Sequence, residues 1–295
     1  MTASGAGAAR LTGVACLLVT SIGWGINWSA MKFLLTQWPP LFARGSAGLI
    51  AACLVAVIAA SRGESLVVAR HLVPGLVLRA LLNVFAWMGF STIALRWLSA
   101  GQGAMLVYTM PVWSMLLAWP LLGKRPHAGG VAGVALCAAG IGVLFGPQSA
   151  SLGAAQWPGV VFALLAATLF AFGTVRLRPL PLPPFTQLAW QLFIGCTPMV
   201  VYGVLFEHPR LAALSAAGAG AFIYMTVFAM GVCYLTWFAA VRRLSPATAS
   251  MGTLLTPVVG VVMGSWTLGE PLGALQWLAL VLVLCGVALA VRERR

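Results

Sequence analysis

Residues 98–126 read LSAGQGAMLVYTMPVWSMLLAWPLLGKRP, and residues 244–272 read LSPATASMGTLLTPVVGVVMGSWTLGEPL. The two stretches align without a gap. Matches of Ala, Leu and Gly arise by chance in an apolar chain, but paired prolines in mid-segment without a gap are a stronger signal. The alignment therefore predicts a duplicated half. The matched pairs include Leu98 with Leu244, Met105 with Met251, Pro111 with Pro257 and Gly123 with Gly269.

The composition indicates a membrane protein. The chain is 61% hydrophobic and only 7% charged, so little of its surface could face water. Most of its apolar runs are near the roughly 20 residues that a helix needs to cross a ~30 Å hydrocarbon core, and they lack the strict alternation of barrel strands. We expect an all-α polytopic membrane protein with ten transmembrane helices. The runs are residues 11–34, 41–61, 73–95, 100–122, 128–145, 157–176, 186–206, 218–241, 247–268 and 273–291.

Lys and Arg gather in alternate loops. With the N-terminus inside, twelve fall on the cytoplasmic side and three on the other, which is the positive-inside bias. Both termini are therefore predicted to be cytoplasmic, and the net charge of +13 is a topology signal rather than a sign of nucleic-acid binding. The cytoplasmic set is Arg10, Arg62, Arg70, Lys124, Arg125, Arg176, Arg178, Arg242, Arg243, Arg292, Arg294 and Arg295, and the opposite set is Lys32, Arg96 and Arg210.

The two copies lie five spans apart, and because five is odd the second half must cross the membrane in the opposite sense. Local charge agrees, since Lys124 and Arg125 follow the first copy whereas Glu270 stands at the matching point of the second. We predict two inverted five-helix repeats, over residues 11–146 and 157–291. In transporters built this way, the substrate site forms between the halves near the membrane midplane.

Pro111 and Pro257 lie about halfway along the fourth and ninth runs. Each lacks a backbone donor and clashes with the preceding turn, so each helix should bend there. The bend is either a static kink, tolerated because neighbouring helices satisfy the freed carbonyl, or a hinge of a gate. The matched position in both halves favours the hinge.

The sequence resembles the drug/metabolite transporter superfamily, in its ten-helix form with two five-helix EamA-type domains. The resemblance covers about residues 11–291, and within the superfamily the chain is similar to the bacterial aromatic amino-acid exporters. It implies export of small metabolites through the bacterial inner membrane by alternating access, with no chemical step and no cofactor. The matching pieces are Gly23-Trp24-Gly25-Ile26-Asn27, Pro111 with Gly123-Lys124-Arg125, Leu255-Thr256-Pro257 and Leu268-Gly269-Glu270.

Acidic residues are scarce. The sequence has no Asp, and its acids Glu64, Glu207, Glu270 and Glu293 all map to loops or helix ends. Proton-coupled transporters commonly place a titratable carboxylate inside the bundle, so we expect facilitated movement, with proton coupling by another route left open. The six cysteines lack metal or redox spacing, so no metal site is expected. A membrane enzyme is disfavoured, because the sequence has neither an Asp-rich metal motif nor a His with an acidic partner inside a span.

Aromatic and uncharged polar side chains share helical faces in several runs. They are interpreted either as packing and interhelical hydrogen bonding or as the lining of a cavity. A pocket of rings, amides and hydroxyls would suit an amino acid with an apolar side chain, although aromatic faces also attract cations. The predicted substrate-binding residues are Trp24, Asn27, Trp28, Asn83, Trp87, Tyr108, Tyr234, Trp237 and Thr253, with Pro111 and Pro257 as gating residues.

Arg44 and Arg79 lie inside the second and third runs, a turn or two from their ends. Snorkelling to the headgroups is the expected behaviour of both side chains. Arg79 has an alternative role, in which it attracts a carboxylate that enters from the cytoplasm.

The leading functional prediction is a monomeric secondary transporter that exports aromatic and other neutral amino acids or related small metabolites. Its expected partners are the small-molecule substrate and the lipid bilayer. The alternatives are a lipid or lipid-carrier flippase and a proton-coupled drug or metabolite efflux protein. Long lateral grooves between helices would favour the flippase, whereas an enclosed central cavity would favour export.

Overall fold

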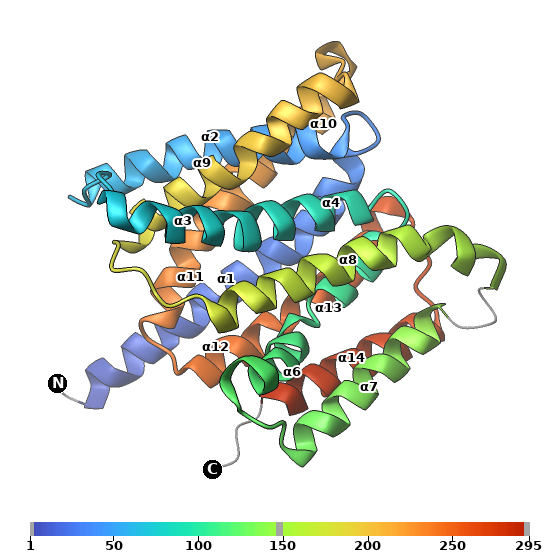
Figure 1. Cartoon of the computed structure of the whole chain (residues 1–295). Helices are drawn as coiled ribbons and strands as arrows, with labels where there is room; N and C mark the ends of the chain where they lie inside the picture. Colours follow the sequence, from blue (N-terminus) through green and yellow to red (C-terminus); the bar gives the residue numbers. More distant parts are fainter. Residues whose placement is uncertain (1–2, 146–149, 292–295) are drawn as a thin grey trace.

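A computed structural model describes residues 3–145 and 150–291, and every regular element within these two ranges is helical (Figure 1). In the described chain, ten helical spans are long and apolar enough to cross a membrane, which confirms the predicted number of helices. They are numbered here as span 1 (Ala9–Leu34), span 2 (Pro40–Ser61), span 3 (Arg70–Ala94), span 4 (Ala100–Leu122), span 5 (Ala128–Phe145), span 6 (Ala155–Arg176), span 7 (Pro184–Glu207), span 8 (Ala216–Val241), span 9 (Thr248–Leu268) and span 10 (Ala274–Val291).

Each of five spans lies within one continuous helix, whereas each of the other five consists of two or more successive helical segments. The single helices are α1 (Ala3–Leu34), α2 (Pro40–Ser61), α7 (Ala128–Phe145), α8 (Ala150–Arg176) and α14 (Ala274–Val291). The composite spans are span 3 with η1 (Arg70–Leu72), α3 (Val73–Ala80), η2 (Leu81–Gly89) and α4 (Phe90–Ala94), span 4 with α5 (Ala100–Val107) and α6 (Met110–Leu122), span 7 with α9 (Pro184–Tyr202) and η4 (Gly203–Glu207), span 8 with α10 (Ala216–Ile223), η6 (Tyr224–Val232) and α11 (Cys233–Val241), and span 9 with α12 (Pro246–Thr253) and α13 (Leu255–Leu268). A short 3-10 turn, η5 (Leu211–Ala213), lies between spans 7 and 8.

The spans pack in matched pairs. Span 1 packs on spans 8 and 9, and span 6 packs on spans 3 and 4. Span 2 packs along span 7, and span 5 packs along span 10. Ala3 and Val291, the first and last described residues, lie at the same end of the bundle, which we call the terminal end (Figure 1). The opposite end, where the chain passes from span 1 to span 2, is called the far end.

Spans 2 and 7 approach closely because small residues line their contact. A side chain added to Gly48 would collide with the thiol of Cys196, and one added to Gly45 would collide with Met199. At the far end, a side chain on Gly203 would collide with the backbone of Phe42. Lipid tails are as apolar as the helices, so such close backbone packing supplies much of the attraction between spans.

Two carboxylates join spans 2 and 7 reciprocally. The carboxylate of Glu207, at the end of η4, accepts hydrogen bonds from the backbone N–H groups of Leu41 (3.2 Å) and Phe42 (2.9 Å) at the start of α2. Glu64, just after α2, accepts from the backbone N–H (2.9 Å) and the hydroxyl (3.2 Å) of Thr186 at the start of α9. The first N–H groups of a helix have no partner within it, and the helix dipole favours an anion there.

A third carboxylate joins spans 4 and 9 at the far end. Glu270 accepts a hydrogen bond of 2.6 Å from the backbone N–H of Ala100, the first residue of α5. Beside it, the ammonium group of Lys32 donates to the backbone carbonyls of Leu95 and Leu98. These contacts tie spans 1, 3, 4 and 9 together at the far end. All three Glu residues in the described chain therefore serve helix N-termini.

Replacing Glu207 with Ala should lower the free energy of unfolding by about 1–2 kcal/mol, because two amide groups at the start of α2 lose their acceptor. The unfolding temperature in detergent measures this change. Thr36→Ala is a suitable control, because its exposed hydroxyl bonds only to the carbonyl of Phe33, three residues back, and a smaller shift is expected. An unfolding temperature unchanged by Glu207→Ala would contradict this role.

Candidate functional site

A cavity of about 770 Å³ lies in the centre of the bundle. Residues from every span except span 5 line it. Pockets for small molecules typically measure about 300–1,000 Å³, so the volume is sufficient for one metabolite-sized ligand. All nine residues predicted to bind substrate line this one cavity.

The cavity extends to the terminal end of the bundle. Its lining includes Pro184, the first residue of α9, and Val291, the last described residue of α14. Thr174, near the end of α8, lies at the same level of the bundle. The deepest lining residues are Met31 and Ser91, each three residues before the far end of its span. The far end beyond them is held together by the contacts of Glu270 and Lys32.

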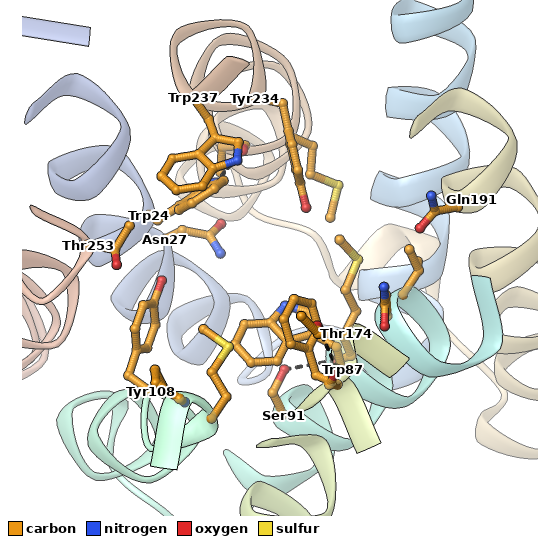
Figure 2. Close-up of a pocket in the computed structure, with 18 of the residues that line it drawn as sticks. Trp24, Asn27, Trp87, Ser91, Tyr108, Thr174, Gln191, Tyr234, Trp237 and Thr253 are labelled. Atoms are coloured by element: carbon orange, nitrogen blue, oxygen red, sulfur yellow. Dashed lines mark hydrogen bonds between the residues drawn. The ribbon is translucent and has the colours of Figure 1, made fainter. Parts of the chain in front are cut away.

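One wall of the cavity is an aromatic cluster from spans 1 and 8 (Figure 2). The ring of Trp24 contacts Tyr234 edge to face, with centroids 5.4 Å apart, and Trp237 at 5.9 Å. The indole N–H of Trp24 donates to the backbone carbonyl of Ala229 (2.9 Å), so its polar atom is satisfied and its orientation is fixed. Such ring pairs contribute about 0.5–1.5 kcal/mol beyond area burial.

The opposite wall comes from spans 3, 4 and 6. Trp87 lies 6.2 Å from Tyr108 and 5.0 Å from Phe170, measured between ring centroids. Ser91, one helical turn beyond Trp87, donates its hydroxyl to the backbone carbonyl of Met88 (3.2 Å). Figure 2 shows the two aromatic walls facing each other across an open space.

Each wall includes a π-helical segment. Asn83 and Trp87 belong to η2 in span 3, and Met230 belongs to η6 in span 8. A π-helix widens the turn, is rare in proteins and occurs frequently at functional sites. The hydropathy of the sequence did not indicate these π-helical segments. Over only nine residues, the spacing of apolar side chains is too similar in an α-helix and a π-helix to tell them apart.

The helices are interrupted next to both matched prolines. Span 4 breaks at Tyr108 and Thr109, just before Pro111 in the first turn of α6. Span 9 breaks at Leu254, three residues before Pro257. The predicted bends are therefore present as breaks between helices. Pro111 lines the cavity, whereas Pro257 is buried outside the lining.

Three of the predicted polar residues differ in their hydrogen bonding. The amide oxygens of Asn27 and Asn83 are buried and have no hydrogen-bond partner among the described residues, so neither oxygen joins two helices. The hydroxyl of Thr253 donates to the backbone carbonyl of Ser250, in its own helix (2.8 Å). The two amides thus contribute unused hydrogen-bonding capacity to the lining.

The structure corrects the expectation for Arg44. Its side chain is only 7% exposed and lines the cavity, rather than extending to a headgroup region. The reason is its position on α2, between α9 and span 8, where Cys196 and Tyr234 are the ionisable groups near enough to interact with it. Arg79 is not in the lining; it donates to the backbone carbonyl of Arg178 (2.6 Å) after α8.

Further lining residues were missed from the sequence. Gln187 and Gln191 are one turn apart on α9, and Gln191 points into the cavity (Figure 2). Thr174 contributes a hydroxyl from span 6. The two glutamines were detectable, because polar residues at i and i+4 within an apolar run mark one helical face.

Comparisons with known proteins agree with this architecture. The chain is 28% identical to the uncharacterized transporter YvbV of Bacillus subtilis, over 91% of this chain and 88% of that one. It is 26% identical to the uncharacterized inner membrane transporter YedA of Escherichia coli K12, over 92% and 88%. A solved crystal structure shares the fold, with a TM-score of 0.63 at 19% identity over 96% of this chain and 97% of that one.

A family model provides the broadest match. It covers residues 11–146 and again residues 157–292, which together make up most of the sequence. The same model matches both ranges, and each range overlaps five of the ten spans in the described chain. The chain is thus a multi-pass membrane protein that belongs to the EamA-like transporter family.

Proposed function

We propose that this protein is a secondary transporter that exports aromatic and other neutral amino acids, or related small metabolites, by alternating access. The observation that carries the proposal is the central cavity, which has two aromatic walls and a lining that includes residues at the terminal end of the bundle but none from the loops at the far end. Nine of the ten spans surround it. This central placement favours export of a soluble molecule over lipid movement along a lateral groove.

The halves are proposed to be two inverted repeats, over residues 11–146 and 157–291. Their packing supports this, because span 1 lies on spans 8 and 9 just as span 6 lies on spans 3 and 4. The composite spans also correspond, since spans 3 and 8 both contain π-helical segments and spans 4 and 9 both break near a proline. A substrate site between such halves fits the arrangement of this transporter class.

We place the terminal end in the cytoplasm, and the protein in a bacterial inner membrane. The positive-inside bias supports this orientation, because the described loops at the terminal end carry six Lys and Arg residues, whereas those at the far end carry two, Arg96 and Arg210. The cavity would then be open to the cytoplasm, which is the state in which an exporter takes up its cargo. The cations of the terminal-end loops are Arg62, Lys124, Arg125, Arg178, Arg242 and Arg243.

The proposed mechanism needs no chemical step. No carboxylate or His is among the lining residues, so the cavity offers no acid for proton coupling, and movement down the cargo gradient is the simplest mechanism. The breaks at Pro111 and Pro257 would let the inner parts of spans 4 and 9 rotate against the outer parts, because hinges need only a few residues that absorb a dihedral change.

Purified protein in liposomes should take up labelled phenylalanine with saturable kinetics, and should do so without a pH gradient. Empty liposomes are the control for passive leak. The measurement is initial uptake rate against concentration, repeated with a pH gradient of either sign. Absence of amino-acid flux in both directions would overturn the proposed substrate class, and flux only with a gradient would overturn the facilitated mechanism.

Trp237→Ala should raise the KM for phenylalanine about three- to tenfold, because one aromatic wall loses contacts worth roughly 0.5–1.5 kcal/mol. Trp157→Ala is the matched control, since this side chain is 61% exposed on the outside of the bundle. The KM of the control should stay at the wild-type value. Equal KM values for Trp237→Ala and Trp157→Ala would show that Trp237 does not contribute to substrate binding.

Pro111→Ala and Pro257→Ala should each lower turnover about tenfold, equivalent to about 1.4 kcal/mol in the barrier, with little change in KM. Alanine restores the missing donor and removes the steric clash, so the interrupted helix becomes continuous and stiffer. Pro198→Ala, inside α9 and outside the lining, is the control. Unchanged turnover in both variants would show that the prolines are static kinks.

A further inference from the structure

The most unusual group in the cavity is the guanidinium of Arg44. Its Nε and Nη1 atoms are buried and have no hydrogen-bond partner in the described chain. The side chain lines the cavity from span 2 and is more than nine-tenths buried. Arg stays protonated in proteins, so a full positive charge lies here without a partner.

No described residue supplies the missing anion. Glu64, Glu207 and Glu270 all accept hydrogen bonds from residues at helix N-termini. The groups near enough to interact with Arg44 are the thiol of Cys196 and the phenol of Tyr234, and both are neutral at neutral pH by their ordinary pKa values. The cavity thus contains a cation and, among its lining residues, no acid.

A charged residue within a membrane span is costly and usually marks a ligand or ion pathway. Snorkelling, which would relieve that cost, is not what Arg44 does. A ligand carboxylate would neutralise the charge, because the planar guanidinium is well suited to pair with carboxylates. The apolar rings of the cavity would take the remainder of the ligand.

We propose that Arg44 binds the carboxylate of the cargo, so that the transported molecules are small aromatic or apolar carboxylates. This inference rests on the proposed transport function and names the chemical group that the cavity selects. Arg44 is the fifth residue of α2, which begins at the far end. The carboxylate therefore enters first and reaches the deep part of the cavity, while the apolar part of the cargo lies between the aromatic walls.

The first experiment uses wild-type protein and needs no mutation. Uptake of labelled phenylalanine into proteoliposomes is competed with 3-phenylpropionate, which lacks the ammonium, and with phenethylamine, which lacks the carboxylate. A hydrogen bond to a charged group contributes about 1.5–3 kcal/mol, so phenethylamine should compete about ten- to hundredfold more weakly than phenylalanine. 3-Phenylpropionate should stay within about tenfold of phenylalanine.

Two results of this competition would overturn the proposal. One is a phenethylamine inhibition constant equal to that of phenylalanine, which would mean that the carboxylate is not recognised. The other is stronger competition by phenyl phosphate than by 3-phenylpropionate, which would assign the site to a phosphate group, such as that of a lipid headgroup.

The second experiment compares Arg44→Gln, Arg44→Lys and the control Arg96→Gln, which removes an exposed cation outside the cavity. Arg44→Gln should raise the KM for phenylalanine about ten- to hundredfold, Arg44→Lys less, and Arg96→Gln not at all. Equal KM values in wild type and Arg44→Gln would overturn the proposal.

Stability distinguishes a binding role from a packing role. Without ligand, Arg44→Gln should unfold at the same temperature as wild type or higher, because an unpaired buried charge is destabilising. A lower unfolding temperature would assign Arg44 to helix packing and overturn the proposal. With 3-phenylpropionate present, the unfolding temperature should rise for wild type, by mass action on the folded state, and not for Arg44→Gln.

These measurements separate the two proposals. If no amino acid is transported but 3-phenylpropionate still stabilises wild type and not Arg44→Gln, the amino-acid export function fails and the carboxylate site stands. If phenylalanine is transported with equal KM by wild type and Arg44→Gln, the carboxylate site fails and the export function stands.

Discussion

The arrangement of this protein depends on where its few carboxylates bind. In a membrane, the unpaired N–H groups at the start of a helix need acceptors within the protein. Glu207, Glu64 and Glu270 provide them for α2, α9 and α5, and in each case the acid comes from the other half of the chain. The same contacts leave the central cavity without a carboxylate, and this sets the charge of the site.

The two ends of the bundle differ in how spans 4 and 9 are joined. At the far end, Glu270 joins spans 9 and 4. The matching position of the first copy is Lys124, which cannot accept a hydrogen bond. Both helix starts are also capped by their own serine: the hydroxyl of Ser99 accepts from the N–H of Gln102 in α5, and that of Ser245 accepts from the N–H of Thr248 in α12. Spans 4 and 9 are therefore joined by a carboxylate at the far end, and the cavity reaches the opposite end. Opening the far end would require breaking the Glu270 contact, at a cost of about 1.5–3 kcal/mol for a hydrogen bond to a charged group.

Much of this fold follows from the sequence, because run length and turn-spaced polar residues are local properties. The ten runs predicted the ten spans, and helical faces brought Trp24, Asn83 and Tyr234 to one cavity. The sequence did not predict the π-helical segments or the burial of Arg44. Both depend on neighbours far along the chain: Arg44 is near enough to a helix end to snorkel, and only the packing of α9 and span 8 around it prevents this. From its position in the sequence alone, Arg44 cannot be distinguished from a cation that faces lipid near the end of a span.

The cavity's charge bears on the kind of cargo more directly than its aromatic rings do. Rings attract cations through their faces, at about 0.5–2 kcal/mol each, so Trp24, Trp87 and Trp237 alone would suit an amine as well as an amino acid. An unpaired guanidinium in the same space repels an amine and attracts a carboxylate, and low-dielectric surroundings strengthen both effects. A binding site for cationic drugs would need an acid that the lining does not contain. In the proposed function, the aromatic walls would therefore contribute affinity for the apolar part of the cargo, while Arg44 would decide the sign of charge that the cavity accepts.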